Sequence, residues 1–412
     1  MEKVTLTPAY ARLYADDYLQ EFGKDQYGEM QIAQAQLDAH TDWRTVSSTM
    51  AVLPIDSHLH AELLLSRPEN TIPRELLHDT ADHAGLILQY QGEESCLRAC
   101  ALPSLLNTIG VSGPVFSRLT KEQLAVALSA LLTGARKTSK IMLRAGKASA
   151  VLSSQYEYMP ITGLLQICGS LEEKFGKSNF LGGNISHSLT MAKFEYPQAT
   201  KAVTDTYNNI LASFGKPLSS SLTPVVEFRS SDTSGDAAKL ITFLSRDGML
   251  IPLGGFNVIH IPPQDYHSDG TRKTCMERFQ EETALLFSRT IFDIEQNLPA
   301  MLATSIHYPG NTFVGLCKYA NIPQKWGGII EEEVRAAYPD GDPCSFLDIY
   351  EALVSVTTEA RNAGISPCSL RMMELEEGIC KILAKHSCWK QYDLPGTVAW
   401  STVSSRAKAV RG

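Results

Sequence analysis

One stretch, residues 140–160 (KIMLRAGKASAVLSSQYEYMP), most constrains the fold of this chain, because it specifies a β-hairpin that leads into a helix. The apolar residues 141–143 predict a short strand, and residues 148–153 predict the strand that returns beside it. The intervening Ala145-Gly146-Lys147 predicts a tight turn, since Gly146 has no Cβ and adopts a positive φ at little cost. The register of this strand pair is therefore fixed locally.

The chain around this hairpin predicts an α+β fold. Its 412 residues, 44% hydrophobic and 20% charged, are enough for two or three compact units. We expect a central antiparallel β-rich unit with hairpins and covering helices, flanked by helical N- and C-terminal regions. The expected divisions are a helical N-terminal region (1–135), a central α+β domain (136–265) and a helical C-terminal region (266–412).

Individual patterns support these divisions. Residues 74–133 carry apolar side chains at helical spacing, as do residues 161–175, 203–214, 284–298, 346–356 and 373–383. Residues 249–253 and 256–261 flank Gly254-Gly255, which predicts a second hairpin with that pair as its turn. Pro252 predicts an edge position for the first of these strands, because proline has no backbone N–H to donate.

The charge pattern contains a local basic segment within an acidic protein. The formal net charge is −8, which disfavours indiscriminate binding to phosphate or anionic lipid. Residues 136–147 nevertheless contain no acid and carry the bases Arg136, Lys137, Lys140, Arg144 and Lys147. Such a segment is typical of a phosphate-contacting hairpin, and also of a sheet edge kept soluble by charge.

Two tyrosines follow the basic segment. Tyr156 and Tyr158 have side chains that stack on bases in nucleic-acid-binding proteins, and that equally serve as half-buried packing. The nucleic-acid interpretation assigns Tyr156 to the binding site together with the five basic residues of segment 136–147.

A second hypothesis rests on the histidines. His58 and His60 follow the apolar run 50–55, and a His-x-His pair after a strand projects both imidazoles to one side, where they can hold a divalent metal such as zinc that activates water. His187, His260 and His307 also follow apolar or β-branched runs and would complete the ligand set. The alternative is that His58 and His60 are surface side chains and that no cofactor is bound.

The cysteines and the hydropathy favour a cytoplasmic protein. Nine cysteines, an odd number, are scattered along the chain, and Cys96 and Cys100 lack a second pair at metal-binding spacing, which predicts free thiols. No segment has the length and apolar character of a signal peptide or a membrane span. We therefore expect no membrane association.

The middle of the chain resembles a known family. The segments KIMLRAGKASAVLSSQYEYMPITGLLQ, TPVVEFRSSDTSGDAAKLITFL and MLIPLGGFNVIHI are similar to an uncharacterised protein family encoded by phages, plasmids and conjugative elements. The resemblance covers residues 138–261, with weaker similarity toward Tyr319. It implies an origin on mobile DNA and, by association, a role in DNA transfer, recombination or evasion of host defence, but it supplies no catalytic residues.

These observations give a leading hypothesis and two alternatives. The leading one is a non-enzymatic accessory protein of a mobile element that binds nucleic acid through the basic hairpin. The first alternative is a metal-dependent hydrolase that uses His58 and His60. The second is a protein-binding or self-assembling module, whose patch would meet an acidic protein partner or another copy of the chain.

Overall fold

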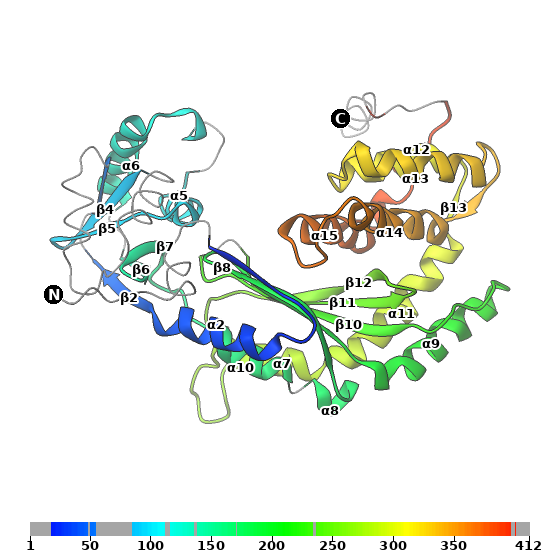
Figure 1. The fold of residues 1–412 in the computed structure, drawn as a ribbon, viewed down its shortest axis with the longest axis horizontal. Coiled ribbons are helices and arrows are strands. Elements are labelled where there is room, and N and C mark those ends of the chain that lie inside the picture. The colour runs from blue at the N-terminus through cyan, green and yellow to red at the C-terminus, as the bar shows by residue number, and fades with distance from the viewer. Residues whose placement is uncertain are drawn as a thin grey trace.

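A computed structural model describes residues 18–47, 50–54, 85–111, 116–135, 138–169, 171–233, 236–396 and 400. It consists of an N-terminal region of short strands and helices, a central six-stranded sheet, and helices on both faces of that sheet (Figure 1). The α+β fold with a central antiparallel sheet is therefore confirmed.

The hairpin predicted from residues 140–160 is present. Strand β6 (Ser139–Arg144) pairs antiparallel with β7 (Lys147–Ser153). The turn residues Ala145 and Gly146 have φ values of 51° and 76°, as a tight hairpin turn requires. An irregular segment then leads into helix α7 (Ile161–Gly169), and β2 (Thr41–Val46) extends the sheet on the other side of β6.

The N-terminal region contains more strand than the helical pattern predicts. Strand β4 (Leu86–Tyr90) pairs with both β3 (Ala51–Pro54) and β5 (Glu93–Cys96). The missed signal is the turn at Gln91 and Gly92, whose φ values of 50° and 82° reverse the chain after four apolar or aromatic side chains. Helices α5 (Leu102–Thr108) and α6 (Lys121–Ala135) pack on these strands and form a separate apolar core.

The central sheet is antiparallel throughout. Its spatial order is β1 (Leu19–Phe22), β8 (Asn179–Ser186), β9 (Thr190–Glu195), β10 (Thr223–Ser230), β11 (Ala238–Arg246) and β12 (Met249–Val258). The predicted hairpin turn at Gly254-Gly255 is wrong, because β12 continues through both glycines. The turn lies instead at Asp247 and Gly248, with φ values of 51° and 81°. Pro252 does lie on an edge strand, as predicted.

Gly255 allows close approach of two strands and does not form the hairpin turn that was predicted. A Cβ atom at this position would lie 2.2 Å from the carbonyl oxygen of Leu240 on the neighbouring strand β11. The strand pairing also shifts register between Thr242 and Phe243, opposite this part of β12. The glycine therefore permits close strand approach at an irregularity rather than a chain reversal.

Helices cover both faces of the sheet (Figure 1). On one side lie α2 (Tyr27–Ala39), α7, α9 (Thr200–Ser213), α10 (Cys275–Ala284) and α11 (Leu286–Ala303), and on the other α12 (Pro309–Tyr319), α13 (Gln324–Ala337), α14 (Phe346–Asn362) and α15 (Leu370–Ala384). The shorter elements are α8 (Glu172–Phe175), β13 (Ser305–Ile306), β14 (Cys344–Ser345), and the 3-10 turns Ala99–Ala101, Phe116–Arg118, Pro197–Ala199 and His386–Cys388. The predicted helical C-terminal stripes are thus confirmed.

The face of the sheet beneath α15 carries a buried charge network. Because side chains alternate along β10, Val226 and Phe228 enter the core that contains α7 and α10, whereas Glu227 and Arg229 face the opposite way. The Nζ atom of Lys193 lies 2.8 Å from Glu376 Oε1 of α15 and 3.1 Å from Glu227 Oε2. Arg229 pairs with Glu227, and it also reaches Glu377 of α15 at 3.3 Å. The network fixes α15 to the sheet.

Candidate ligand-binding cleft

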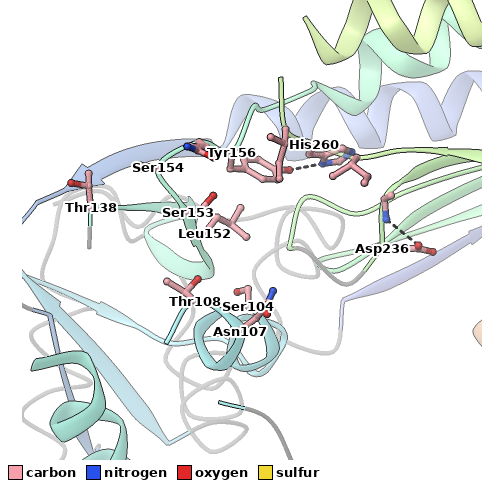
Figure 2. A pocket seen from close by; sticks show the side chains of 14 residues that line it. Ser104, Asn107, Thr108, Thr138, Leu152, Ser153, Ser154, Tyr156, Asp236 and His260 are labelled. Carbon is pink, nitrogen blue, oxygen red and sulfur yellow. Dashed lines mark hydrogen bonds between the residues drawn. The ribbon is translucent and has the colours of Figure 1, made fainter. Parts of the chain in front are cut away.

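Two adjoining cavities lie where the N-terminal region meets one end of the central sheet. The larger has a volume of about 720 Å³ and is lined by α5, by the end of β7 and by the segment that follows β12 (Figure 2). The smaller, of about 500 Å³, shares Ser154, Gln155, Tyr156 and Ile261 with the first. Because they share these walls, we treat them as one cleft.

The two cavities differ in the chemistry of their walls. The larger combines the apolar Leu152, Ile259 and Ile261 with the polar side chains Ser104, Asn107, Thr108, Thr138, Ser153 and Asp236. The smaller is lined by charged side chains, Lys140, Glu157 and Arg272, together with Gln264. The cleft therefore has a partly apolar chamber whose lining includes one carboxylate, Asp236, beside a chamber lined by Lys140, Glu157 and Arg272.

The segments after β7 and after β12 are joined across the cleft. The Glu157 N–H donates to the His260 carbonyl oxygen at 3.0 Å, and the Tyr156 hydroxyl lies 2.8 Å from His260 Nδ1 (Figure 2). Trp43 of β2 stacks on the Tyr156 ring with the ring centroids 5.5 Å apart. These contacts hold Tyr156 at the boundary between the two cavities.

The surroundings of His260 determine its protonation and tautomer. Burial lowers the pKa of His260 to about 4, so the ring is neutral at neutral pH. The backbone N–H of Ala238 donates to Nε2 at 3.2 Å, which requires a lone pair on that nitrogen. The single ring proton therefore resides on Nδ1, and His260 donates to the oxygen of Tyr156.

This direction of donation leaves the Tyr156 hydroxyl proton for another acceptor. No hydrogen bond from the Tyr156 hydroxyl to a further side chain or carbonyl occurs within the described residues. Burial raises the pKa of Tyr156 far above its ordinary value, so the phenol stays protonated. Tyr156 is consequently a hydrogen-bond donor, and His260 is not positioned to remove its proton.

The cations of the cleft are bonded to carbonyl oxygens. Lys140 Nζ donates to the Tyr156 carbonyl oxygen at 2.6 Å. Arg272 donates through Nε to the Pro263 carbonyl and through Nη2 to the Pro262 carbonyl at 2.9 Å. Neither cation forms an ion pair with a carboxylate in the described part of the chain.

The basic side chains of the predicted nucleic-acid site lie in different environments in the structure. Arg136 and Lys137 lie outside the described residues. Lys140 is half-buried and reaches the cleft, whereas Arg144 and Lys147 are only 2% and 4% exposed. These last two side chains are directed into the protein, so the hairpin does not present them to a phosphate backbone as the basic pattern suggests.

Arg144 joins the N-terminal region to the central sheet. Its Nη2 lies 3.1 Å from Asp232 Oδ2 in the loop after β10, and its Nη1 donates to the His187 carbonyl between β8 and β9. Burial raises the pKa of Asp232 to about 7, although the Arg144 charge acts in the opposite direction. Charge reversal at Arg144 would break this buried contact, so it would not report on ligand binding alone.

The histidines of the metal hypothesis do not converge within the described residues. His58 and His60 lie outside them. His187 is buried against the ring of Tyr18, His260 has both ring nitrogens in hydrogen bonds, and His307 lies 3.4 Å from Asp393. No cluster of three or more His, Cys, Asp or Glu side chains suited to a metal occurs in the described part of the chain.

The cysteines are free, as predicted. All nine thiols are unpaired with one another and are buried or half-buried. Cys96 lies in β5 and Cys100 in the 3-10 turn Ala99–Ala101.

Sequence reasoning missed Arg272 and the adjoining wall formed by Ile259 and Ile261. These two isoleucines are 67% and 48% exposed, on either side of the buried His260. The apolar run 256–261 and the loop marked by Pro262-Pro263 were visible in the sequence, but the exposure of the two isoleucines and the burial of His260 were not, because hydropathy alone favours the reverse. The pairing of Arg272 with the carbonyls of those prolines was not visible, because it depends on how the loop folds back.

The structure is an α+β protein with a cleft of mixed polar and apolar lining at one end of an antiparallel sheet. No family model, no curated protein and no solved structure matches the chain. In the described portion of the chain, none of the helices has both the length and the apolar composition needed to cross a membrane. The resemblance to the phage and plasmid family therefore stays a prediction.

Proposed function

We propose that this protein binds a strand of nucleic acid in the cleft, as a non-enzymatic accessory protein of a mobile element. The observation that carries the proposal is the pair of cations, Lys140 and Arg272, which border one cavity and are bonded only to carbonyl oxygens. A carbonyl dipole orients a cation without neutralising it, so both remain available to a phosphate oxygen.

The charge balance of the cleft agrees with an anionic ligand. The smaller cavity contains two cations and one carboxylate, Glu157, whose Oε1 already accepts the Cys275 backbone N–H at 3.0 Å. In the larger cavity Asp236 is neutralised by Lys239, with Nζ 2.7 Å from Oδ2. The cleft is thus locally positive within a protein whose net charge is −8, which favours a localised phosphate contact.

The chemistry of the cleft favours binding over catalysis. A nucleophilic tyrosine requires a base that withdraws its proton, and His260 instead donates to Tyr156. The resemblance to proteins of mobile elements supports nucleic acid as the anion.

The test is fluorescence-anisotropy titration of labelled single-stranded DNA, duplex DNA and RNA at several salt concentrations. We expect binding whose logarithm falls linearly with the logarithm of salt concentration. Lys140→Gln and Arg272→Gln should each weaken binding and each reduce the slope by about 0.7 on a single strand, because each removes one phosphate contact.

The matched control is Lys216→Gln. Lys216 is exposed and follows α9, which lies on the opposite side of the molecule from the hairpin β6–β7 (Figure 1). Lys216→Gln changes the net charge by the same amount as the two cleft variants, but it does not alter the cleft. The salt slope should therefore stay at the wild-type value. Equal slopes for all three variants would show that the cleft is not the phosphate site, and no binding at low salt would overturn the proposal.

A further inference from the structure

The two cavities of the cleft have linings that suit different parts of a nucleotide. The smaller cavity offers the cations Lys140 and Arg272, which suit a phosphate group. The larger offers aliphatic side chains beside hydroxyl and amide groups, which suit a nucleobase with its apolar faces and polar edge. Tyr156 lines both, so its hydroxyl proton is available to an oxygen atom between base and phosphate.

Asn107 is one of the residues of the larger cavity whose side chains make no hydrogen bond within the described residues, and it is the one that lies on α5. The Ser104 hydroxyl donates to the Ala101 carbonyl and the Thr108 hydroxyl to the Val151 carbonyl, so both retain only acceptor capacity. The exposed Asn107 amide makes no side-chain hydrogen bond within the described residues, and it offers a donor and an acceptor side by side. A nucleobase edge presents the complementary pair of groups.

We infer that the cleft holds one unstacked nucleotide of the bound strand, with its base in the larger cavity, its phosphate beside Lys140 and Arg272, and the Tyr156 hydroxyl donating to a backbone oxygen between them. The inference rests on the proposed function and adds the mode of binding. The volumes of about 720 Å³ and 500 Å³ both lie in the range of about 300–1,000 Å³ that is typical of small-ligand sites.

Two consequences follow for ligand preference. A base in a duplex must be unpaired and unstacked before it enters the cavity, at a cost of a few kcal/mol, so single strands bind more tightly than duplexes of the same length. Leu152, Ile259 and Ile261 give the larger cavity aliphatic walls, and its two rings, Tyr156 and His260, are buried and pack against each other. We therefore expect the base to lose its stacked neighbours without gaining an aromatic one.

The direct test uses a single-stranded oligonucleotide that contains one 2-aminopurine, a base whose fluorescence is quenched by stacking on its neighbours. The oligonucleotide is short enough to occupy one site. Binding of the full-length protein should raise its 2-aminopurine fluorescence severalfold. Tyr156→Phe should weaken binding about tenfold, because it removes a hydrogen bond to the ligand. Tyr266→Phe is the matched control, since Tyr266 is 60% exposed and outside both cavities, and it should bind as wild type.

Asn107→Ala provides a second test that remains valid if Tyr156→Phe fails to fold. Asn107→Ala alters an exposed side chain of α5 and should weaken binding while leaving the salt slope unchanged, because no phosphate contact is lost. Salt-dependent binding without a rise in 2-aminopurine fluorescence, and with Asn107→Ala equal to wild type, would overturn the inference and leave the proposed function standing. No binding at low salt would overturn both.

Discussion

The protein places cations in two contrasting environments around one sheet. Beneath α15, Lys193 and Arg229 are 2% or less exposed and each contacts at least one carboxylate. In the cleft, Lys140 and Arg272 contact carbonyl oxygens and border open cavities. A buried charge is stable only when an opposite charge accompanies it, whereas a cation beside solvent needs no such partner. The first environment therefore fixes structure, and the second leaves charge available for a ligand.

The largest expected effect tests the buried network. Lys193→Met removes the cation between Glu227 and Glu376 and leaves these two carboxyl groups facing each other inside the protein. We expect the free energy of unfolding to fall by about 3–5 kcal/mol, measured by urea denaturation. The control is Lys201→Met, which breaks an exposed pair with Asp205 and should leave the unfolding midpoint unchanged. A loss as small as that of the control would mean that the network does not hold α15.

The second prediction concerns the junction at Asp232. Its folded pKa, raised by burial to about 7, lies above its ordinary value, so protonated Asp232 favours the folded state. That stabilisation is complete below about pH 4 and is lost as the pH rises through 7. Between pH 5 and pH 8 the contribution should fall by about 2.5 kcal/mol.

Asp232→Asn isolates this contribution from other titrating groups. The difference in unfolding free energy between wild type and variant, measured in urea at pH 5 and pH 8, should move in favour of the variant as the pH rises. A difference independent of pH would show that Arg144, 3.1 Å away, keeps Asp232 ionised in the folded protein throughout this range.

The sequence predicted local structure better than it predicted burial. The turn at Gly146 and the helices of the C-terminal region depend on neighbouring residues, and these are present. The turn at Gly254-Gly255 was wrong because a glycine pair also satisfies the demands of close strand approach, and only the position of Leu240 on the next strand distinguishes the two uses.

The candidate site shows the same limit. Arg144 and Lys140 lie four residues apart in one basic segment, yet the first is buried against Asp232 and the second borders the cleft. Asp232 and Arg272 lie far from them in sequence, so composition alone did not show which cation would be neutralised. The sequence predicted Tyr156 as a binding residue, but it did not predict the hydrogen bond of Tyr156 with His260, which joins residues 104 positions apart.

The third prediction separates the structural role of Tyr156 from its role in binding. Tyr156→Phe leaves the Nδ1 proton of His260 without its acceptor, which should lower the unfolding free energy by about 1 kcal/mol. This is the low end of the range for an unsatisfied buried donor, because the adjoining cavity admits water. Urea denaturation measures the loss, and a loss comparable with that of Lys193→Met would place Tyr156 with the structural network instead.

The smallest expected effect on stability belongs to the exposed cation of the cleft. Arg272→Gln removes hydrogen bonds to two proline carbonyls in a surface loop, and exposed carbonyls are solvated by water when the guanidinium is lost. The unfolding free energy should change by no more than about 0.5 kcal/mol in urea, although we expect the same variant to weaken the proposed nucleic-acid binding. Lys193→Met should show the opposite pattern, with a large loss of stability and wild-type affinity for the fraction that remains folded. If Arg272→Gln instead destabilised the protein as strongly as Lys193→Met, the cleft cations would be structural, and the contrast between the two environments would fail.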